Sequence, residues 1–325
     1  MDISVLYKSK DYATILEYFE TSYLSASDSD KYYLGLSLFE LGYKREGADL
    51  LVDTVTRLRN DDCSRGMGYI GLSFFSIGEY IQATDWLYKS ATLMGEFSSE
   101  SSKWLKLLHL SESARPAAFH ENEYMRFHYV DCFSPVTRDE FEKNYTAAYV
   151  QLMSFFEVKL PKKIDVFIYN GHTDSIGGNL SYANPPLETI HVYIFEDCGH
   201  ELAHVVSNYI PGGISVKSPF VDEGIAEYFN RTKYYTNFDQ NNHNIDIFDL
   251  WANFRAYDRN YSHAIAKRFF SELIECGGKK RALALLHEQT IANAQKIYGK
   301  LLFEIKKHTE LDVFNGRFDC PANNK

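Results

Sequence analysis

Proline is confined to one part of the chain, and no other feature restricts the fold as strongly. All eight prolines lie at or after Pro116, so the first 115 residues contain none. A proline inside a helix removes a backbone hydrogen bond and clashes with the preceding turn. The proline-free stretch therefore favours packed helices. The change in composition predicts a domain boundary between residues 1–115 and 116–325.

The proline-free part also contains an internal repeat. Residues 34–51 read LGLSLFELGYKREGADLL and residues 70–87 read IGLSFFSIGEYIQATDWL, an offset of 36 that aligns Gly42 with Gly78. Small residues recur where two antiparallel helices would approach closely, and apolar residues recur at helical spacing. Weaker patterns predict an earlier helix and a closing helix, at residues 10–19 and 102–112.

These repeats resemble tetratricopeptide repeats, whose pattern has Leu-Gly in the first helix, Gly at the turn and Ala in the second helix. Leu34-Gly35, Gly42 and Ala83 occupy those places here. The resemblance implies an all-α domain of helical hairpins, whose concave surface recruits or orients a protein substrate or partner. The alternative is that the repeats are a rigid support for the second domain.

Beyond Pro116 the pattern changes to a short sheet followed by helices. Alternating apolar residues predict strands at residues 122–130, 163–170 and 188–195. Residues 137–157 read as a helix, in which Thr137 and Glu140 have the spacing of a capping box. The stretch between the second and third strands has the composition of a loop. Residues from 197 to about 309 read as mainly helical, so the fold class is α+β.

Composition excludes several classes of protein. Hydrophobic residues make up 45% and charged residues 24%, as in ordinary folded proteins. No stretch approaches the ~18 apolar residues of a membrane span. The net charge of −10 and the absence of a long Lys/Arg run argue against nucleic-acid binding. The five cysteines form no CxxC pair, so neither a disulfide framework nor a cysteine zinc site is indicated.

The cysteines and the N-terminus together predict a cytoplasmic location. Scattered cysteines in an odd number are typical of free thiols in a reducing compartment. The first twenty residues lack a basic segment followed by an apolar one and a small-residue cleavage site. An export signal removed before this numbering begins stays an open alternative.

One short motif carries the chemistry. Residues 200–204 read HELAH, which fits the HExxH pattern of zinc peptidases. On a helix, His200 and His204 lie one turn apart on the same face, roughly 6 Å along the axis, so both imidazoles can reach one cation. Glu201 lies beside the first histidine, where its carboxylate can approach a metal-bound water. The alternative is a buried, hydrogen-bonded histidine pair on a core helix.

A second motif supplies a third ligand candidate. The metzincin pattern HExxHxxGxxH is excluded, because Ser207 and Ile210 occupy its Gly and third His positions. Instead, DEGIAEY follows at residues 222–228 and places Glu223 19 positions beyond His204. The pair of motifs resembles the gluzincins, the thermolysin and aminopeptidase type of zinc peptidase, in which a second helix supplies a glutamate ligand from a sequence like NEGxAEY.

The resemblance implies a zincin-like domain with a small mixed sheet, a helical C-terminal part and one Zn²⁺ ion held by His200, His204 and Glu223. Glu201 would accept a proton from the metal-activated water and pass it to the leaving amine. Glu227 would orient a ligand histidine from the outer shell, where Asp222 replaces the usual Asn. A transition-state stabiliser is also implied downstream. The candidates are Tyr257, Tyr261 and His263, of which we favour Tyr261.

The implied function is hydrolysis of peptide bonds. Aminopeptidases of this type carry a GxMEN strand, and no such sequence occurs here. We therefore expect an endopeptidase that pairs an extended peptide along an edge strand at residues 188–195. The alternative is a protein that binds metal but turns over weakly, and that serves as an interaction scaffold.

Overall fold

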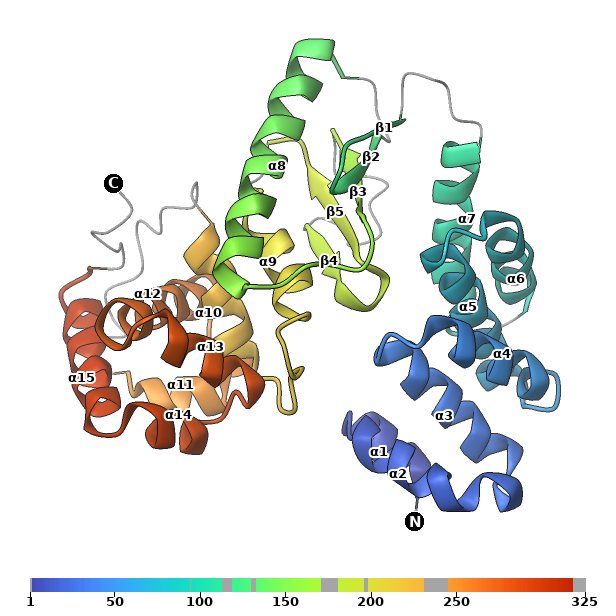
Figure 1. The fold of residues 1–325 in the computed structure, drawn as a ribbon, viewed down its shortest axis with the longest axis horizontal. Helices are drawn as coiled ribbons and strands as arrows, with labels where there is room; N and C mark the ends of the chain where they lie inside the picture. The colour runs from blue at the N-terminus through green and yellow to red at the C-terminus, as the bar shows by residue number, and fades with distance from the viewer. Residues whose placement is uncertain are drawn as a thin grey trace.

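The computed structural model describes residues 2–93, 95–112, 119–129, 133–170, 181–195, 198–230 and 245–317. Over these residues the protein is α+β, mostly helical with one small mixed sheet. The sheet lies between the N-terminal helices and the C-terminal helices (Figure 1). None of the described helices is long and apolar enough to cross a membrane.

Helices and one short 3-10 turn make up the described chain before the sheet: α1 (Ile3–Lys8), α2 (Tyr12–Ser22), η1 (Tyr23–Ser25), α3 (Asp28–Glu40), α4 (Lys44–Val55), α5 (Asn60–Ser76), α6 (Tyr80–Thr92) and α7 (Ser98–Glu112). The predicted helix at residues 10–19 overlaps α2 from Tyr12 on, and the one at residues 102–112 falls within α7, so both predictions are confirmed in type.

The two copies of the sequence repeat take up matching geometry. Gly42 follows α3 with φ +93°, and Gly78 follows α5 with φ +81°; both conformations are strained for any residue with a side chain. A Cβ atom on Gly35 would lie 2.7 Å from Cγ of Leu51, and one on Gly71 would lie 2.6 Å from Cγ of Leu87. The α3–α4 and α5–α6 pairs therefore pack closely at equivalent glycines.

The rest of the described chain contains the sheet and the C-terminal helices: β1 (Phe119–Glu121), β2 (Met125–Tyr129), α8 (Pro135–Phe156), β3 (Ile164–Tyr169), β4 (Tyr182–Asn184), η2 (Pro185–Leu187), β5 (Thr189–Tyr193), α9 (His200–Ser207), α10 (Pro219–Phe229), α11 (Ile247–Ala252), η3 (Phe254–Ala256), α12 (Arg259–Gly277), α13 (Lys279–His287), α14 (Ile291–Tyr298) and α15 (Lys300–Phe314). Helix α8 begins two residues before the predicted start. Its N-cap is Ser134, whose side chain accepts a hydrogen bond from the Thr137 amide, so the capping box placed at Thr137 was wrong.

The sheet corrects one prediction about the edge strand. Its order is β1-β2-β3-β5-β4, in which β2, β3 and β5 run parallel and the two outer strands run antiparallel to their neighbours. The strand predicted at 188–195 is β5, which pairs on both sides and is not an edge. The edge strand beside β5 is β4, which lies in the stretch predicted as loop. A strand of three residues is too short to show an alternating apolar pattern.

The two faces of the sheet belong to different hydrophobic cores. Alternate residues such as Val166 and Ile190 pack with α8, α9, α10 and α12. The opposite face contributes Phe167 to a core with the N-terminal helices, where Trp104 packs edge-on against Phe167 and His191 with ring centroids 6.2 and 5.6 Å apart. The boundary predicted at residue 115 lies outside the described residues. The core that contains Trp104 and Phe167 nevertheless has side chains from both sides of residue 115.

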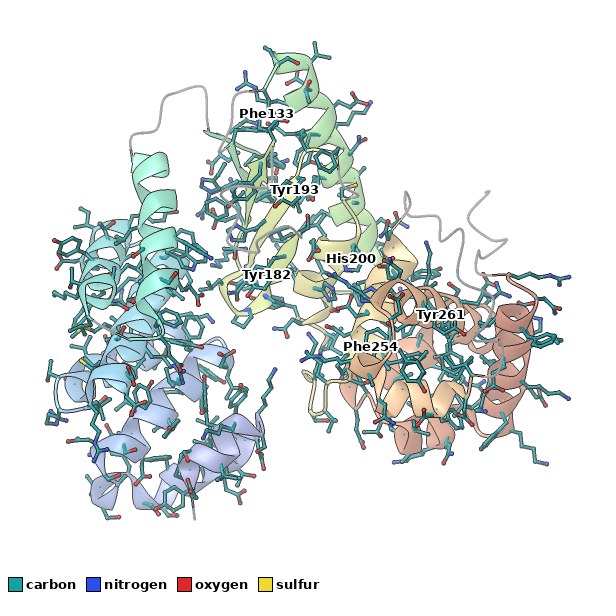
Figure 2. All side chains as sticks on the ribbon, turned by 180° about the vertical axis from the view of Figure 1, so that it is seen from behind. Phe133, Tyr182, Tyr193, His200, Phe254 and Tyr261 are labelled. Carbon is teal, nitrogen blue, oxygen red and sulfur yellow. The ribbon has the colours of Figure 1, made fainter. Side chains whose placement is uncertain are left out.

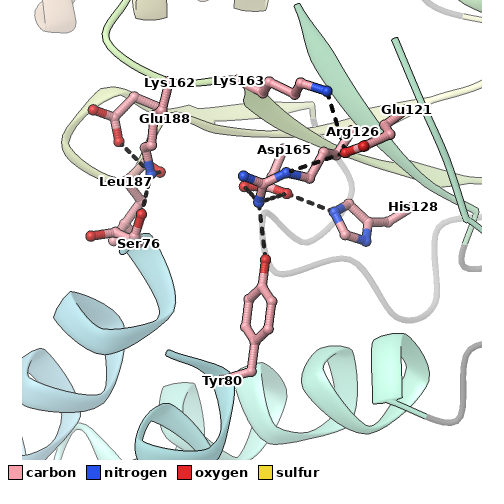
Figure 3. Close-up of polar contacts among 10 residues, drawn as sticks. All are labelled: Ser76, Tyr80, Glu121, Arg126, His128, Lys162, Lys163, Asp165, Leu187 and Glu188. Atoms are coloured by element: carbon pink, nitrogen blue, oxygen red, sulfur yellow. Dashed lines mark hydrogen bonds and ion pairs between the residues drawn. The ribbon is translucent and has the colours of Figure 1, made fainter. Parts of the chain in front are cut away.

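Polar contacts fix the same junction (Figure 3). The Lys162 ammonium donates a hydrogen bond to the Ser76 carbonyl at the end of α5, at 2.8 Å, and pairs with Glu188 at 2.9 Å. Arg126 on β2 donates to the hydroxyl of Tyr80 on α6, at 2.9 Å. The last helical pair is therefore attached to the sheet by charge as well as by packing.

A third and smaller core serves the N-terminal end. It consists of Ile3, Ile15, Phe19 and Leu34, from α1, α2 and α3. All four are buried, but they form a cluster of their own, apart from the core that contains Trp104. Tyr7 of α1 and Tyr33 of α3 are partly buried and pack against both cores, so the two cores meet at these two rings.

Candidate metal centre

Helices α9 and α10 bring the three predicted ligands together. The Nε2 atoms of His200 and His204 lie 3.3 Å apart. Oε2 of Glu223 lies 3.4 Å from the first of these nitrogens and 3.6 Å from the second. Figure 2 places His200 between the sheet, marked by Tyr182 and Tyr193, and the C-terminal helices.

The spacing of these atoms matches the needs of a zinc ion. In a tetrahedral site the distance between ligand atoms is about 1.6 times the bond length, so bonds of about 2.0–2.2 Å need ligand atoms about 3.3–3.6 Å apart. Glu223 Oε2 is a buried atom for which no hydrogen bond of good geometry is formed. The positions of the three ligand atoms therefore suit the coordination of one cation.

Glu201 lies next to this triangle. It is only 9% exposed, and its carboxylate has an oxygen within 4.8 Å of a ring nitrogen of both His200 and His204. It follows His200 directly on α9, so it approaches the centre from beside the ligands. This position suits a group that acts on a water molecule at the metal, and the base role of Glu201 stays a prediction.

The outer nitrogen of each histidine faces a carboxylate. Nδ1 of His204 lies 3.2 Å from Asp222, which also pairs with Lys217 at 3.0 Å. Nδ1 of His200 lies 3.4 Å from Oε1 of Glu227. Such carboxylates orient ligand histidines and raise their basicity. Glu227 and Asp222 therefore lie beside the histidines as the predicted outer-shell role requires, and that role stays a prediction for both.

The charges at the site oppose the effects of burial. Burial alone would raise the pKa of Glu223, but the imidazoles of His200 and His204 hold it well below its usual value. Burial would lower the pKa of His204, but Asp222 and Glu223 keep it well above its usual value. Glu223 is therefore ionised at neutral pH, as a carboxylate ligand must be.

Helix α12 covers α10 and adds a residue to the site. A Cβ on Gly224 would lie 2.9 Å from the carbonyl oxygen of Ala266, so glycine permits this close approach. One turn earlier on α12, Nδ1 of His263 lies 3.2 Å from Oε1 of Glu227. The sequence named His263 only among three candidates for a different role, and it gave no sign that α12 would pack on α10.

Tyr261 lies in the first turn of α12 and is 8% exposed. Residues two apart on a helix do not share a face, so Tyr261 and His263 point in different directions. Tyr261 belongs to the main hydrophobic core, and burial raises the pKa of its hydroxyl. The side of α12 that faces Glu223 and Glu227 carries His263, and the stabilising role given to Tyr261 stays a prediction.

A second group of potential ligands has a different explanation. Atoms of Glu272, His308 and Asp312 lie close together. The guanidinium of Arg268 lies among them, where it hydrogen-bonds to Glu272 and, at 2.7 Å, to Asp312. A fixed cation already balances these carboxylates, so we interpret the group as a buried ion-pair network.

Comparisons with protein-family models, with curated proteins and with solved structures found no match to this chain.

Proposed function

We propose that this chain is a zinc-dependent peptidase of the gluzincin type, with tetratricopeptide-like repeats that recruit or orient a protein substrate or partner. The observation that carries the proposal is the triangle of His200, His204 and Glu223, whose 3.3–3.6 Å edges suit tetrahedral zinc. Two further carboxylates behind the histidines support it, because a merely structural histidine pair does not need them.

The chemistry assigned to each residue follows from its position. Zinc, when bound, would supply a Lewis acid that polarises the scissile carbonyl and activates water. His200, His204 and Glu223 would hold the ion and leave one position open. Glu201 would accept the proton of the attacking water and pass it to the leaving nitrogen. Neither step requires Glu201 to be a ligand.

The edge strand suggests how a peptide would be held. Among the described residues β4 pairs with β5 alone, so the backbone groups on its other side can pair with an extended chain. Tyr182 on this strand is 40% exposed. Helix α9 follows β5 after a short connection, which brings strand and motif together in sequence. We propose endopeptidase action on a peptide added along β4 in place of the β5 pairing first predicted.

Metal content tests the proposal directly. Protein purified without a histidine tag should carry about one zinc per chain, and Glu223→Ala should lose most of it on dialysis, because two ligands remain. Glu304→Ala, at an exposed position on α15, is the matched control and should keep the metal. Plasma mass spectrometry on the three proteins measures the ratio. Wild-type protein that holds no zinc, even after zinc is added back, would refute the proposal.

A further inference from the structure

We propose that His263 is a positioning residue, which fixes the carboxylate of Glu227 and, through it, the imidazole of His200. This inference rests on the proposed zinc site, but it concerns a residue on a third helix outside both motifs. His263 is 4% exposed and Glu227 is fully buried. Neither side chain can exchange its partner for water.

Two donors hold the Glu227 carboxylate, and Nδ1 of His200 lies beside it without a hydrogen bond. Asn230 donates to Oε2 at 3.0 Å, while Nδ1 of His263 lies 3.2 Å and Nδ1 of His200 lies 3.4 Å from Oε1. An ionised carboxylate can only accept, so Nδ1 of His263 carries the proton in this contact. The carboxylate cannot rotate towards or away from His200 without losing its bond to Asn230 or to His263.

The location of His263 is itself fixed. Its ring is nearly parallel to that of His200, with 13° between the planes and 6.4 Å between the centroids. The ring of Phe254 packs against it at 5.5 Å. The close approach of Gly224 to Ala266 sets the distance between α10 and α12. The close contact between α10 and α12 therefore holds Nδ1 of His263 beside Glu227.

His263 does not serve as a ligand in this arrangement. Its Nδ1 lies nearer to Glu227 than to Oε2 of Glu223, at 3.2 against 3.6 Å. The residue acts on the metal through two other side chains.

The affinity for zinc separates this role from a purely structural one. Asn can place an amide donor near the position of Nδ1, whereas Gln places it near Nε2 and Leu offers none. We expect His263→Gln and His263→Leu to bind zinc about 10- to 100-fold more weakly than wild type, as is usual for lost outer-shell partners. His263→Asn should recover most of the affinity. Competition with a coloured chelator measures the dissociation constants.

Two further measurements complete the design. Visible absorption of the cobalt-substituted proteins reports the ligand geometry, and we expect the bands to shift in the Gln and Leu variants and to return in the Asn variant. His120→Gln, at an exposed histidine on β1, is the matched control. Circular dichroism of the metal-free proteins identifies any variant that has not folded. If one fails to fold, the zinc affinities of His263→Asn and His263→Gln are compared, and they decide whether the donor matters.

The outcomes distinguish this inference from the proposed function. Equal zinc affinities and cobalt spectra for wild type and all three variants would overturn the role of His263 and leave the zinc site intact. A folded Asn variant as weak as the Leu variant would also overturn it, because the donor would then not matter. Wild type that binds no zinc would refute both. Zinc binding without turnover would leave the role of His263 standing.

Discussion

Glu201→Gln should keep about one zinc ion per chain and lower kcat by about 10²- to 10⁴-fold, the usual contribution of a general base. Gln has nearly the size of Glu, and the three proposed ligands do not include residue 201, so the metal should stay in place. The amide cannot accept the proton of the attacking water. Release of fluorescence from a quenched peptide library measures the turnover, and metal analysis of the same samples measures the zinc.

Glu304→Gln is the control for this substitution, since residue 304 is exposed on α15. It should match wild type in both measurements. Undiminished turnover by Glu201→Gln would contradict the assignment of the base. A wild-type protein that carries zinc and binds peptides, but cleaves none of the library, would instead favour the alternative of a weakly active scaffold.

Trp104→Ala should lower the free energy of unfolding by about 3–5 kcal/mol, the range for removing a large buried aromatic side chain. Trp104 is 1% exposed and packs against Phe75 from the helices and Phe167 from the sheet. The substitution would leave a cavity between the N-terminal helices and the sheet, and neither of these parts could fill it alone. Urea unfolding followed by circular dichroism measures the loss.

Trp86→Ala is the matched comparison, because Trp86 is only partly buried against the same core. Its loss should be clearly smaller. Equal losses for the two variants would show that the junction contributes no more than an ordinary helix surface, and would contradict the importance given to the Trp104 contacts.

The helical parts of the fold could be predicted because their signals are long. The 36-residue offset and the absence of proline give the paired helices, and the glycines at 42 and 78 mark the turns where φ is positive. The order of the sheet could not be predicted. Strands β1 and β4 have three residues each, and a pairing partner is set by contacts distant in sequence, which local patterns do not record.

The candidate site, too, could be predicted only in part from the sequence. Within one helix, spacing alone places His200 beside His204, and Glu223 and Glu227 four residues apart on one face. The relation between helices is a tertiary property. Nothing in the stretch around His263 shows that α12 would lie against Gly224, so the donor to Glu227 was missed and Tyr261 was preferred.

The separate small core of α1, α2 and α3 has a consequence for motion. Hydrogen exchange samples local openings whose cost depends on the contacts broken, and in stacked repeats each unit contacts only its neighbours. Opening α1 and α2 disrupts Ile3, Ile15 and Phe19 and takes the partly buried Tyr7 away from the Trp104 core, whose own buried residues lie on later elements. The amides of α1 and α2 should therefore exchange well before those of β3 and β5. A partner that binds this end could order it while His200 and Glu223 stay where they are.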